Sequence, residues 1–352
     1  MIGKDSFSIG KRKFLTGMVA TGFAAAVPSV VLGANQRIVF ANYGGSWEQA
    51  MRRAWIEPFT KKTGIRVISA SGNTLGRLQA MVEARNVEWD LVEGTPELAG
   101  IGARKGLLEP LDFKIIDRSS MLDRPEFFAD HMVPGIILGR VLVVNKKLGS
   151  VPPQWSSLFN VARFPGKRTF WNKVESGLLE IALLADGVAA DKLYPLDLPR
   201  AFKKLDTIKE HILWFETVTQ SEQFMRDGQA VMGVLADGRA QSVKMNGAPV
   251  EIMPEASILL WSVFVIPKGA PNKAAAMKFL AHVYTLQSQV AITREYNYGP
   301  IMPQAMDQIP ADRLGLISGG PATKGKGVFL NTAWWDRNLE RTTEQFLNWR
   351  LG

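Results

Sequence analysis

The chain has 352 residues, a formal net charge of +9 at pH 7 and no cysteine. Without cysteine it can form no disulfide and carry no lipid on a cysteine, so its buried apolar side chains must stabilise the fold alone. Beyond the N-terminal segment no run of basic residues exceeds two, as in Lys146-Lys147, which argues against a nucleic-acid partner.

The first 34 residues have the features of a secretory signal peptide. Lys4 and the cluster Lys11-Arg12-Lys13 form a basic head, and residues 14–34 carry no charge and end in small side chains. This stretch is too weakly apolar for a spanning helix, which needs ~20 strongly apolar residues. We therefore predict a signal peptide over residues 1–34 and a periplasmic protein. The basic cluster resembles a twin-arginine signal with lysine in the first position, so both the Tat and the Sec route stay open.

After this segment, strand and helix patterns alternate as they do in an α/β fold. The expected order is a strand over 37–41, a helix opened by Ser46, a strand over 65–70, a helix over 73–85 and a strand over 89–93. Gln49 lies three residues after Ser46, which predicts a capping box at the start of the first helix.

The rest of the chain continues the alternation. We expect strands over 140–145, 169–171, 229–235 and 262–266, and helices over 177–186, 198–211, 272–284 and 332–350. The chain is long enough for two hydrophobic cores, and no Gly/Ser-rich or Pro-rich linker separates them. We therefore predict two lobes that are joined by crossing strands.

Six short motifs follow one another in the order of a known family. They are Tyr43-Gly-Gly-Ser-Trp47, EPFTKKTGI at 57–65, GLLEPLD at 106–112, PQW at 153–155 with PGK at 165–167, VIPKGAPNK at 265–273 and YGP at 298–300. Together they resemble the polyamine-type class of bacterial extracellular solute-binding proteins.

The resemblance implies a two-lobed, type II-like periplasmic-binding-protein fold of the α/β class, with mixed sheets flanked by helices and a ligand cleft between the lobes. We assign residues 35–138 plus 263–306 to lobe 1 and residues 139–262 plus 307–352 to lobe 2. We expect a monomer that delivers a small molecule to the permease of an ABC importer in the inner membrane.

Several candidate ligand-binding residues lie where predicted strands end. Open α/β sheets bind ligands at the carboxyl ends of strands, close to helix N-termini. An arginine such as Arg239 can hold a carboxylate through two hydrogen bonds, although a solvated arginine fits the pattern as well. Our candidates are Tyr43, Gly45, Ser46, Trp47, Ser71, Asn73, Glu93, Trp171, Asp237, Arg239, Trp261 and Tyr298.

The residues give a partial indication of the ligand. Polyamine binders of the resembled class pair acidic residues with ammonium groups, but the acid expected after Trp261 is replaced by Ser262, and Lys173 stands where another acid is expected. We therefore expect a small amine that also bears a carboxylate. Two alternatives stay open, a true polyamine such as putrescine or spermidine, and ferric iron held by tyrosines such as Tyr296 and Tyr298.

The sequence gives little support for catalysis. His131, His211 and His282 are the three histidines, and they lie far apart and outside any metal-binding spacing. No nucleophile motif and no phosphate-binding loop is present. We therefore expect a binding protein, not an enzyme, without a cofactor or a bound metal.

Overall fold

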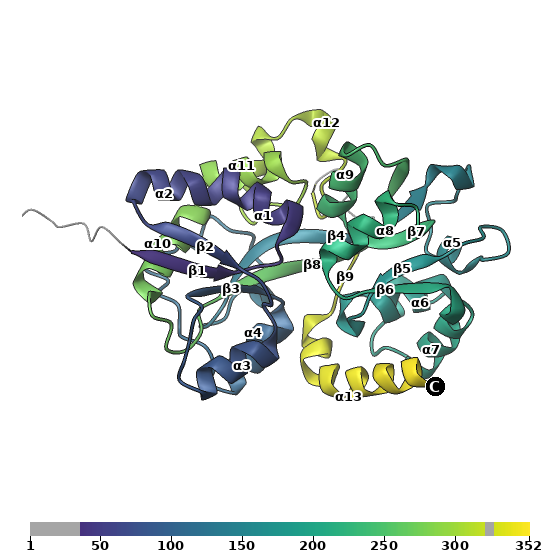
Figure 1. Cartoon of the computed structure of the whole chain (residues 1–352), viewed down its shortest axis with the longest axis horizontal. Coiled ribbons are helices and arrows are strands. Elements are labelled where there is room, and N and C mark those ends of the chain that lie inside the picture. Colours follow the sequence, from purple (N-terminus) through teal and green to yellow (C-terminus); the bar gives the residue numbers. More distant parts are fainter. Residues whose placement is uncertain (1–35, 321–326) are drawn as a thin grey trace, which may run out of the picture. The chain divides into compact units, whose positions relative to one another are not determined.

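The computed structural model describes residues 36–320 and 327–352 (Figure 1). The predicted signal peptide over 1–34 lies outside these residues. Within them the strands form one mixed sheet in the order β2-β1-β3-β8-β4-β7-β5-β6, with β9 paired to β8. The strands are β1 (Arg37–Ala41), β2 (Arg66–Ala70), β3 (Leu91–Gly94), β4 (Val133–Asn145), β5 (Arg168–Trp171), β6 (Ile212–Phe215), β7 (Met232–Ala236), β8 (Val250–Val265) and β9 (Gly327–Phe329).

The two long strands β4 and β8 run through the centre of the sheet. They pair antiparallel from Val133 opposite Phe264 to Asn145 opposite Val250. Strand β3 joins β8 at one end of this pair, and β7 joins β4 toward the other end. Figure 1 shows β1, β2 and β3 on one side of this centre and β5, β6 and β7 on the other. The long pair therefore connects two groups of strands, as the predicted crossing strands require.

Both long strands extend well beyond the predicted ranges 140–145 and 262–266. The early part of β4 contains a proline and two glycines, which lower strand propensity. The register shifts between Pro134 and Ile137 and again between Val141 and Leu142. Proline and glycine inside a strand commonly mark such bulges. This part of β4 is a strand because it is fully buried. Its burial cannot be inferred from local residue preference, so the prediction began the strand too late.

Two main hydrophobic cores surround the two groups of strands. The first packs Trp47, Trp55 and Phe40 around β1 and β3, and the second packs Phe170 and Trp335 around β5. Full burial of side chains of this size contributes roughly 1.5–3 kcal/mol each. Two large clusters among the described residues agree with the expected two cores, and the assignment of residues to two lobes stays a prediction.

Helices cover both faces of the sheet (Figure 1). They are α1 (Gly45–Met51), which continues through a π-helical turn (Arg52–Ile56) into α2 (Glu57–Thr63), then α3 (Leu75–Glu83), α4 (Pro96–Arg104), α5 (Ser156–Phe159), α6 (Leu178–Ala185), α7 (Leu198–Asp206), α8 (Val218–Arg226), α9 (Asp237–Met245), α10 (Lys273–Val283), α11 (Leu286–Glu295), α12 (Ala311–Leu314) and α13 (Thr332–Leu351).

The capping box predicted for Ser46 and Gln49 is wrong. The N-cap of α1 is Gly44, whose φ of 63° suits glycine, and no side chain caps the helix. The hydroxyl of Ser46 instead contacts Glu222 and Tyr296. A capping box is present at α8, where Thr217 and Gln220 satisfy each other's backbone N–H groups. Helices α8 and α9 and strand β6 were not among the predicted elements.

The C-terminal helix α13 is fixed to the second core by a buried carboxylate. One oxygen of Glu180, a fully buried residue, accepts hydrogen bonds from Trp335 Nε1 at 2.7 Å and from the Tyr194 hydroxyl at 2.6 Å. On the same helix, Trp349 Nε1 donates to Asp206 at 2.7 Å, but this pair is exposed.

These two bonds allow a matched test of stability. Because Trp335→Phe leaves a buried carboxylate short of a donor, we expect it to cost about 1–3 kcal/mol of unfolding free energy. The control Trp349→Phe removes the same kind of bond in water and should cost less than half as much. Urea denaturation of both variants measures the difference, and equal losses would contradict the role given to Glu180.

Candidate functional site

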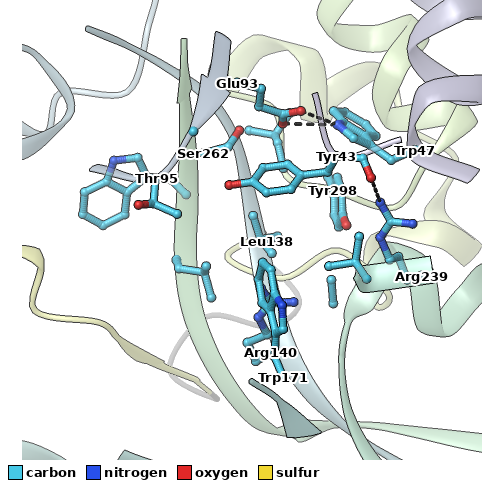
Figure 2. A pocket seen from close by; sticks show the side chains of 16 residues that line it. Tyr43, Trp47, Glu93, Thr95, Leu138, Arg140, Trp171, Arg239, Ser262 and Tyr298 are labelled. Atoms are coloured by element: carbon cyan, nitrogen blue, oxygen red, sulfur yellow. Dashed lines mark hydrogen bonds between the residues drawn. The ribbon is translucent and has the colours of Figure 1, made fainter. Parts of the chain in front are cut away.

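A cavity of about 50 Å³ lies where the two groups of strands meet the central pair (Figure 2). Such a volume restricts the occupant to a small molecule. The lining residues come from the ends of β1, β3, β5 and β7, from β4 and β8, from α1, from the starts of α8 and α9, and from the segment after α11 (Leu286–Glu295). They are Tyr43, Trp47, Glu93, Gly94, Thr95, Ile136, Leu138, Arg140, Trp171, Val218, Ala236, Arg239, Leu260, Trp261, Ser262 and Tyr298.

Arg140 is the least satisfied charged group in this lining. Its side chain is 5% exposed, and its guanidinium makes no hydrogen bond to any residue that the structure describes. Its neighbour is the indole of Trp171, 4.7 Å from the guanidinium carbon. Burial lowers the pKa of Arg140. A buried guanidinium without acceptors is costly, so this position favours an anionic partner.

Arg168 shows how this protein otherwise buries an arginine. It is fully buried, and its guanidinium donates to backbone carbonyl groups of the 158–166 segment, including Leu158 at 2.8 Å and Phe164 at 2.6 Å. Its donors therefore have protein acceptors, whereas those of Arg140 have none. The contrast makes Arg140 a candidate binding residue.

Glu93 lies at the opposite end of the cavity from Arg140. Figure 2 shows Tyr43 and Leu138 between them. Trp47 Nε1 donates to both carboxylate oxygens of Glu93, at 2.9 and 3.2 Å. Burial raises the pKa of Glu93 to about 7, and the hydrogen bonds from Trp47 oppose the rise. No described residue forms an ion pair with Glu93, so its carboxylate is available to pair with a cationic group of a ligand.

Aromatic side chains form the walls between the two charged ends. The rings of Tyr43 and Trp171 meet edge to face with centroids 6.3 Å apart, and those of Trp47 and Tyr298 are 5.0 Å apart. Trp261 is 2% exposed, and its Nε1 has no hydrogen-bond partner in the described part of the chain. The walls are therefore apolar, with one free N–H group.

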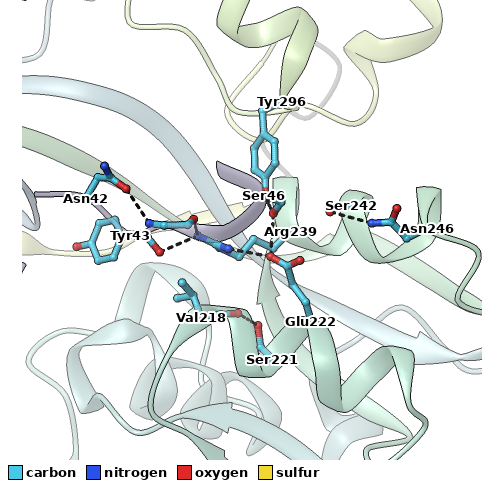
Figure 3. A network of polar contacts seen from close by, with 11 residues as sticks. Asn42, Tyr43, Ser46, Val218, Ser221, Glu222, Arg239, Ser242, Asn246 and Tyr296 are labelled. Atoms are coloured by element: carbon cyan, nitrogen blue, oxygen red, sulfur yellow. Dashed lines mark hydrogen bonds and ion pairs between the residues drawn. The ribbon is translucent and has the colours of Figure 1, made fainter. Parts of the chain in front are cut away.

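Arg239 takes part in a polar network beside the cavity (Figure 3). Its Nη1 donates to Glu222 at 2.7 Å, and its Nη2 donates to the backbone carbonyl of Gly44 at 3.0 Å. Ser46 Oγ lies 2.8 Å from the same carboxylate and 2.7 Å from the Tyr296 hydroxyl. The network ties the β1–α1 turn to α8 and α9. The role predicted for Arg239 in holding a ligand carboxylate stays a prediction, since Glu222 already pairs with it here.

Gly45 is needed for this close approach. A Cβ at Gly45 would lie 2.9 Å from Arg239 Nη1 and 2.9 Å from Thr219 Oγ1, and the φ of Gly45 is 64°. Any larger side chain would both clash and strain the backbone. Gly45 therefore shapes the network without lining the cavity.

The structure brings together seven of the twelve candidate residues in one lining. These are Tyr43, Trp47, Glu93, Trp171, Arg239, Trp261 and Tyr298. Gly45, Ser46, Ser71, Asn73 and Asp237 do not line it.

The remaining candidates have other contacts. Asn73 donates to the backbone carbonyl of Glu93 at 2.6 Å and so supports the cavity indirectly. The backbone carbonyl of the exposed Ser71 accepts from Arg77. Asp237 is 4% exposed, and one of its oxygens accepts from the Gly238 N–H at 2.9 Å.

Sequence reasoning missed Arg140 and Glu222 as functional candidates. Arg140 reads as the first residue of an apolar strand, and a single charge in a run of buried strand residues was the available signal. Glu222 lies in the middle of the unpredicted α8 and carries no motif. Glu222 and Arg239 are 17 residues apart in the sequence, and their pairing depends on how α8 packs against α9.

The described residues contain neither a metal-binding cluster nor a membrane-spanning helix. No group of three or more Asp, Glu, His or Cys side chains in 36–320 and 327–352 is arranged to hold a metal ion. No helix in these ranges has the length and apolar character needed to cross a bilayer.

Sequence comparison places the chain in a family. The family described as bacterial extracellular solute-binding protein matches residues 54–314. A gamma-aminobutyric acid-binding protein of Pseudomonas aeruginosa is 30% identical over 336 residues, which cover 93% of this chain and 94% of that one. Spermidine/putrescine-binding periplasmic protein 1 of Haemophilus influenzae is 22% identical, over 84% of this chain and 83% of that one. The chain therefore belongs to the bacterial extracellular solute-binding proteins.

Solved structures agree with this membership. The structure of the GABA receptor Atu4243 superposes with a TM-score of 0.79 at 36% identity, covering 90% of this chain and 98% of that one. The periplasmic binding protein AgtB from A. tumefaciens R10, in complex with agropinic acid, gives 0.83 at 28% identity, covering 90% and 99%. The predicted α/β fold class of periplasmic binding proteins is thus confirmed.

The buried pair Arg239–Glu222 can be tested by truncation. Glu222→Ala leaves a buried guanidinium without its carboxylate, so we expect a loss of about 3–5 kcal/mol in unfolding free energy. The exposed pair Arg200–Asp186 gives the control, because Asp186→Ala should cost at most about 1 kcal/mol. Chemical denaturation measures both, and similar losses would contradict a structural role for the network.

Buried carboxyl groups also make stability depend on pH. Burial raises the pKa of Glu93, Glu97 and Asp237 to about 7, from usual values of 4.5, 4.5 and 3.8. Between about pH 4.5 and 7 the folded protein therefore holds protons that the unfolded chain has released, so these groups destabilise the fold as pH rises through this window.

We expect Asp237→Asn to flatten this dependence, because the amide cannot ionise. The slope lost is at most about 1.4 kcal/mol per pH unit. Unfolding of the unliganded protein and the variant between pH 5 and 8, in steps of about one unit, measures the change. An unchanged slope in the variant would show that Asp237 does not titrate in this range.

Proposed function

We propose that the chain is the periplasmic substrate-binding component of an ABC importer, and that its ligand is a small amine that bears a carboxylate, such as 4-aminobutyrate. The observation that carries this proposal is the buried, unpartnered guanidinium of Arg140 facing a cavity whose other end is Glu93. The two relatives named for gamma-aminobutyric acid support the same ligand class. Nothing in the site calls for catalysis.

The geometry suits a molecule with opposite charges at its two ends. The guanidinium of Arg140 can hold a carboxylate through two parallel hydrogen bonds. Glu93, oriented by Trp47, can accept an ammonium group, and ionisation of Glu93 is favoured once the cation is bound. The aromatic walls then cover the short apolar chain between the two groups.

A true polyamine fits this cavity less well. Putrescine and spermidine carry only ammonium groups, so one of their charges would lie close to Arg140 and leave its guanidinium unpaired. Ser262 also stands where the polyamine-type class is expected to have an acid. The polyamine-binding relative is more distant, at 22% identity.

Ferric iron is a weaker alternative for a different reason. The rings of Tyr296 and Tyr298 lie 4.9 Å apart, but burial raises the pKa of both tyrosines above the usual value. Iron(III) requires hard anionic oxygens, and these hydroxyl groups are held in their neutral form. A cation there would also lie close to Arg239.

The two predicted lobes supply a mechanism for capture and release. We propose that residues 35–138 plus 263–306 and residues 139–262 plus 307–352 move as rigid bodies about β4 and β8, in a monomer that docks on a permease. The bonds of Arg239 and Ser46 join Gly44 and the start of α1 to α8 and α9 across this division. They would hold the lobes together once the ligand is enclosed.

Substitution of Arg140 tests the ligand class. The protein to titrate by calorimetry is residues 35–352, without the predicted signal peptide. We expect this protein to bind 4-aminobutyrate tightly and to bind putrescine and spermidine weakly. Arg140→Gln should weaken 4-aminobutyrate at least about 100-fold, since a buried carboxylate would lose its charged partner.

The control is Arg337→Gln, because Arg337 is exposed on α13 and lies outside the cavity. This variant should bind like the wild-type protein. Tight binding of spermidine together with no binding of the carboxylate ligand would overturn the proposed function.

A further inference from the structure

A second, smaller hollow adjoins the ligand cavity. Its volume is about 20 Å³, close to the space that one water-sized group occupies. Thr95, Arg140, Trp171, Leu260 and Trp261 line both hollows and form the wall between them. The remaining lining residues belong to the second hollow alone and are Pro96, Glu97, Lys173, Glu175, Ser176, Leu330 and Thr332.

Two carboxylates of this hollow lack a cationic partner. Glu97 is 4% exposed, and neither Glu97 nor Glu175 forms an ion pair with any residue in the described ranges. The ammonium of Lys173 lies over the ring of Trp171, 4.8 Å from its centroid, and pairs with neither acid. A buried acid in this situation gains from a cation that enters from outside.

The shared wall supplies an independent sign of a ligand. Arg140 and Trp261 are each at least nine-tenths buried, and both hold N–H groups that no described residue accepts. Buried donors are almost always satisfied by protein, water or a ligand. A molecule bound across the wall would give these donors an acceptor and would reach both acidic ends.

The two hollows therefore share a basic group, and each also has acidic groups of its own. Arg140 lines both hollows, Glu93 lines the first one alone, and Glu97 and Glu175 line the second one alone. A ligand that matches these groups has one carboxylate and two ammonium groups. A compound with one ammonium group leaves the second hollow without a cation.

Building on the proposed function, we propose that the second hollow is a subsite for a second ammonium group and that the preferred ligands are diamino monocarboxylic acids. The carboxylate is held by Arg140, one ammonium by Glu93 and the other by Glu97 with Glu175. The small volume limits the second group to a primary ammonium with little attached to it.

Titration of the unliganded protein with paired ligands tests the subsite. The probes are 4-aminobutyrate and L-2,4-diaminobutyrate, which differ by one amino group, together with L-ornithine. We expect at least one diamino acid to bind about tenfold or more tightly than 4-aminobutyrate, because the added ammonium meets a buried acid.

Substitution at the second hollow separates the two subsites. Glu97→Gln should remove the gain for the diamino acid while the affinity for 4-aminobutyrate stays within about twofold, as expected for a subsite that it does not reach. Glu175→Gln changes a partly exposed position and should reduce the extra affinity for the diamino acid. This variant replaces Glu97→Gln in the test if Glu97→Gln does not fold. Glu344→Gln, on the exposed face of α13, is the control and should leave both affinities unchanged.

The outcomes separate this inference from the function on which it rests. Binding of 4-aminobutyrate with no gain for either diamino acid, or an equal loss for both ligand types in Glu97→Gln, overturns the subsite alone. Failure of both 4-aminobutyrate and the diamino acids to bind overturns the proposed function as well.

Discussion

The antiparallel pairing of β4 with β8 is the constraint on which the rest of the structure depends. The pair runs from Val133 opposite Phe264 to Asn145 opposite Val250, and the other strand groups attach to it. It also carries Arg140 on one strand and Trp261 with Ser262 on the other. A slip of one residue would turn each of these side chains to the opposite face of the sheet. The frame of the fold and the polar groups of the site are therefore set by one register.

Several buried groups around the ligand cavity lack the partners that other buried groups of this protein have. Arg168 is buried with acceptors for its donors, and Asp90 accepts hydrogen bonds from Val39 and Asn272. Around the cavity, by contrast, Arg140 and Trp261 keep unpaired donors, and Glu93 and Glu97 lack cations. Under the proposed function, a ligand would satisfy the groups around the cavity.

The sequence predicted those features that depend on local pattern. The alternation of elements, the turn at Tyr43–Ser46 and the polar ends of β1 and β3 all follow from periodicity and from glycine and proline positions. Features that depend on distant packing were not accessible. The bulged half of β4 is a strand because of burial, and the hydroxyl of Ser46 contacts Glu222 rather than its own helix. Arg140 became a candidate only when its lack of partners was visible.

The stacking of Arg140 on Trp171 has a spectroscopic consequence. The emission of an indole responds to charges near its ring, and the guanidinium carbon lies 4.7 Å from this one, with the Lys173 ammonium at 4.8 Å. A carboxylate that binds Arg140 would offset part of the positive field on the indole. Under the proposed function, Trp171 would thereby report the occupancy of the cavity without any attached dye, as a change on top of the emission of the other nine tryptophans.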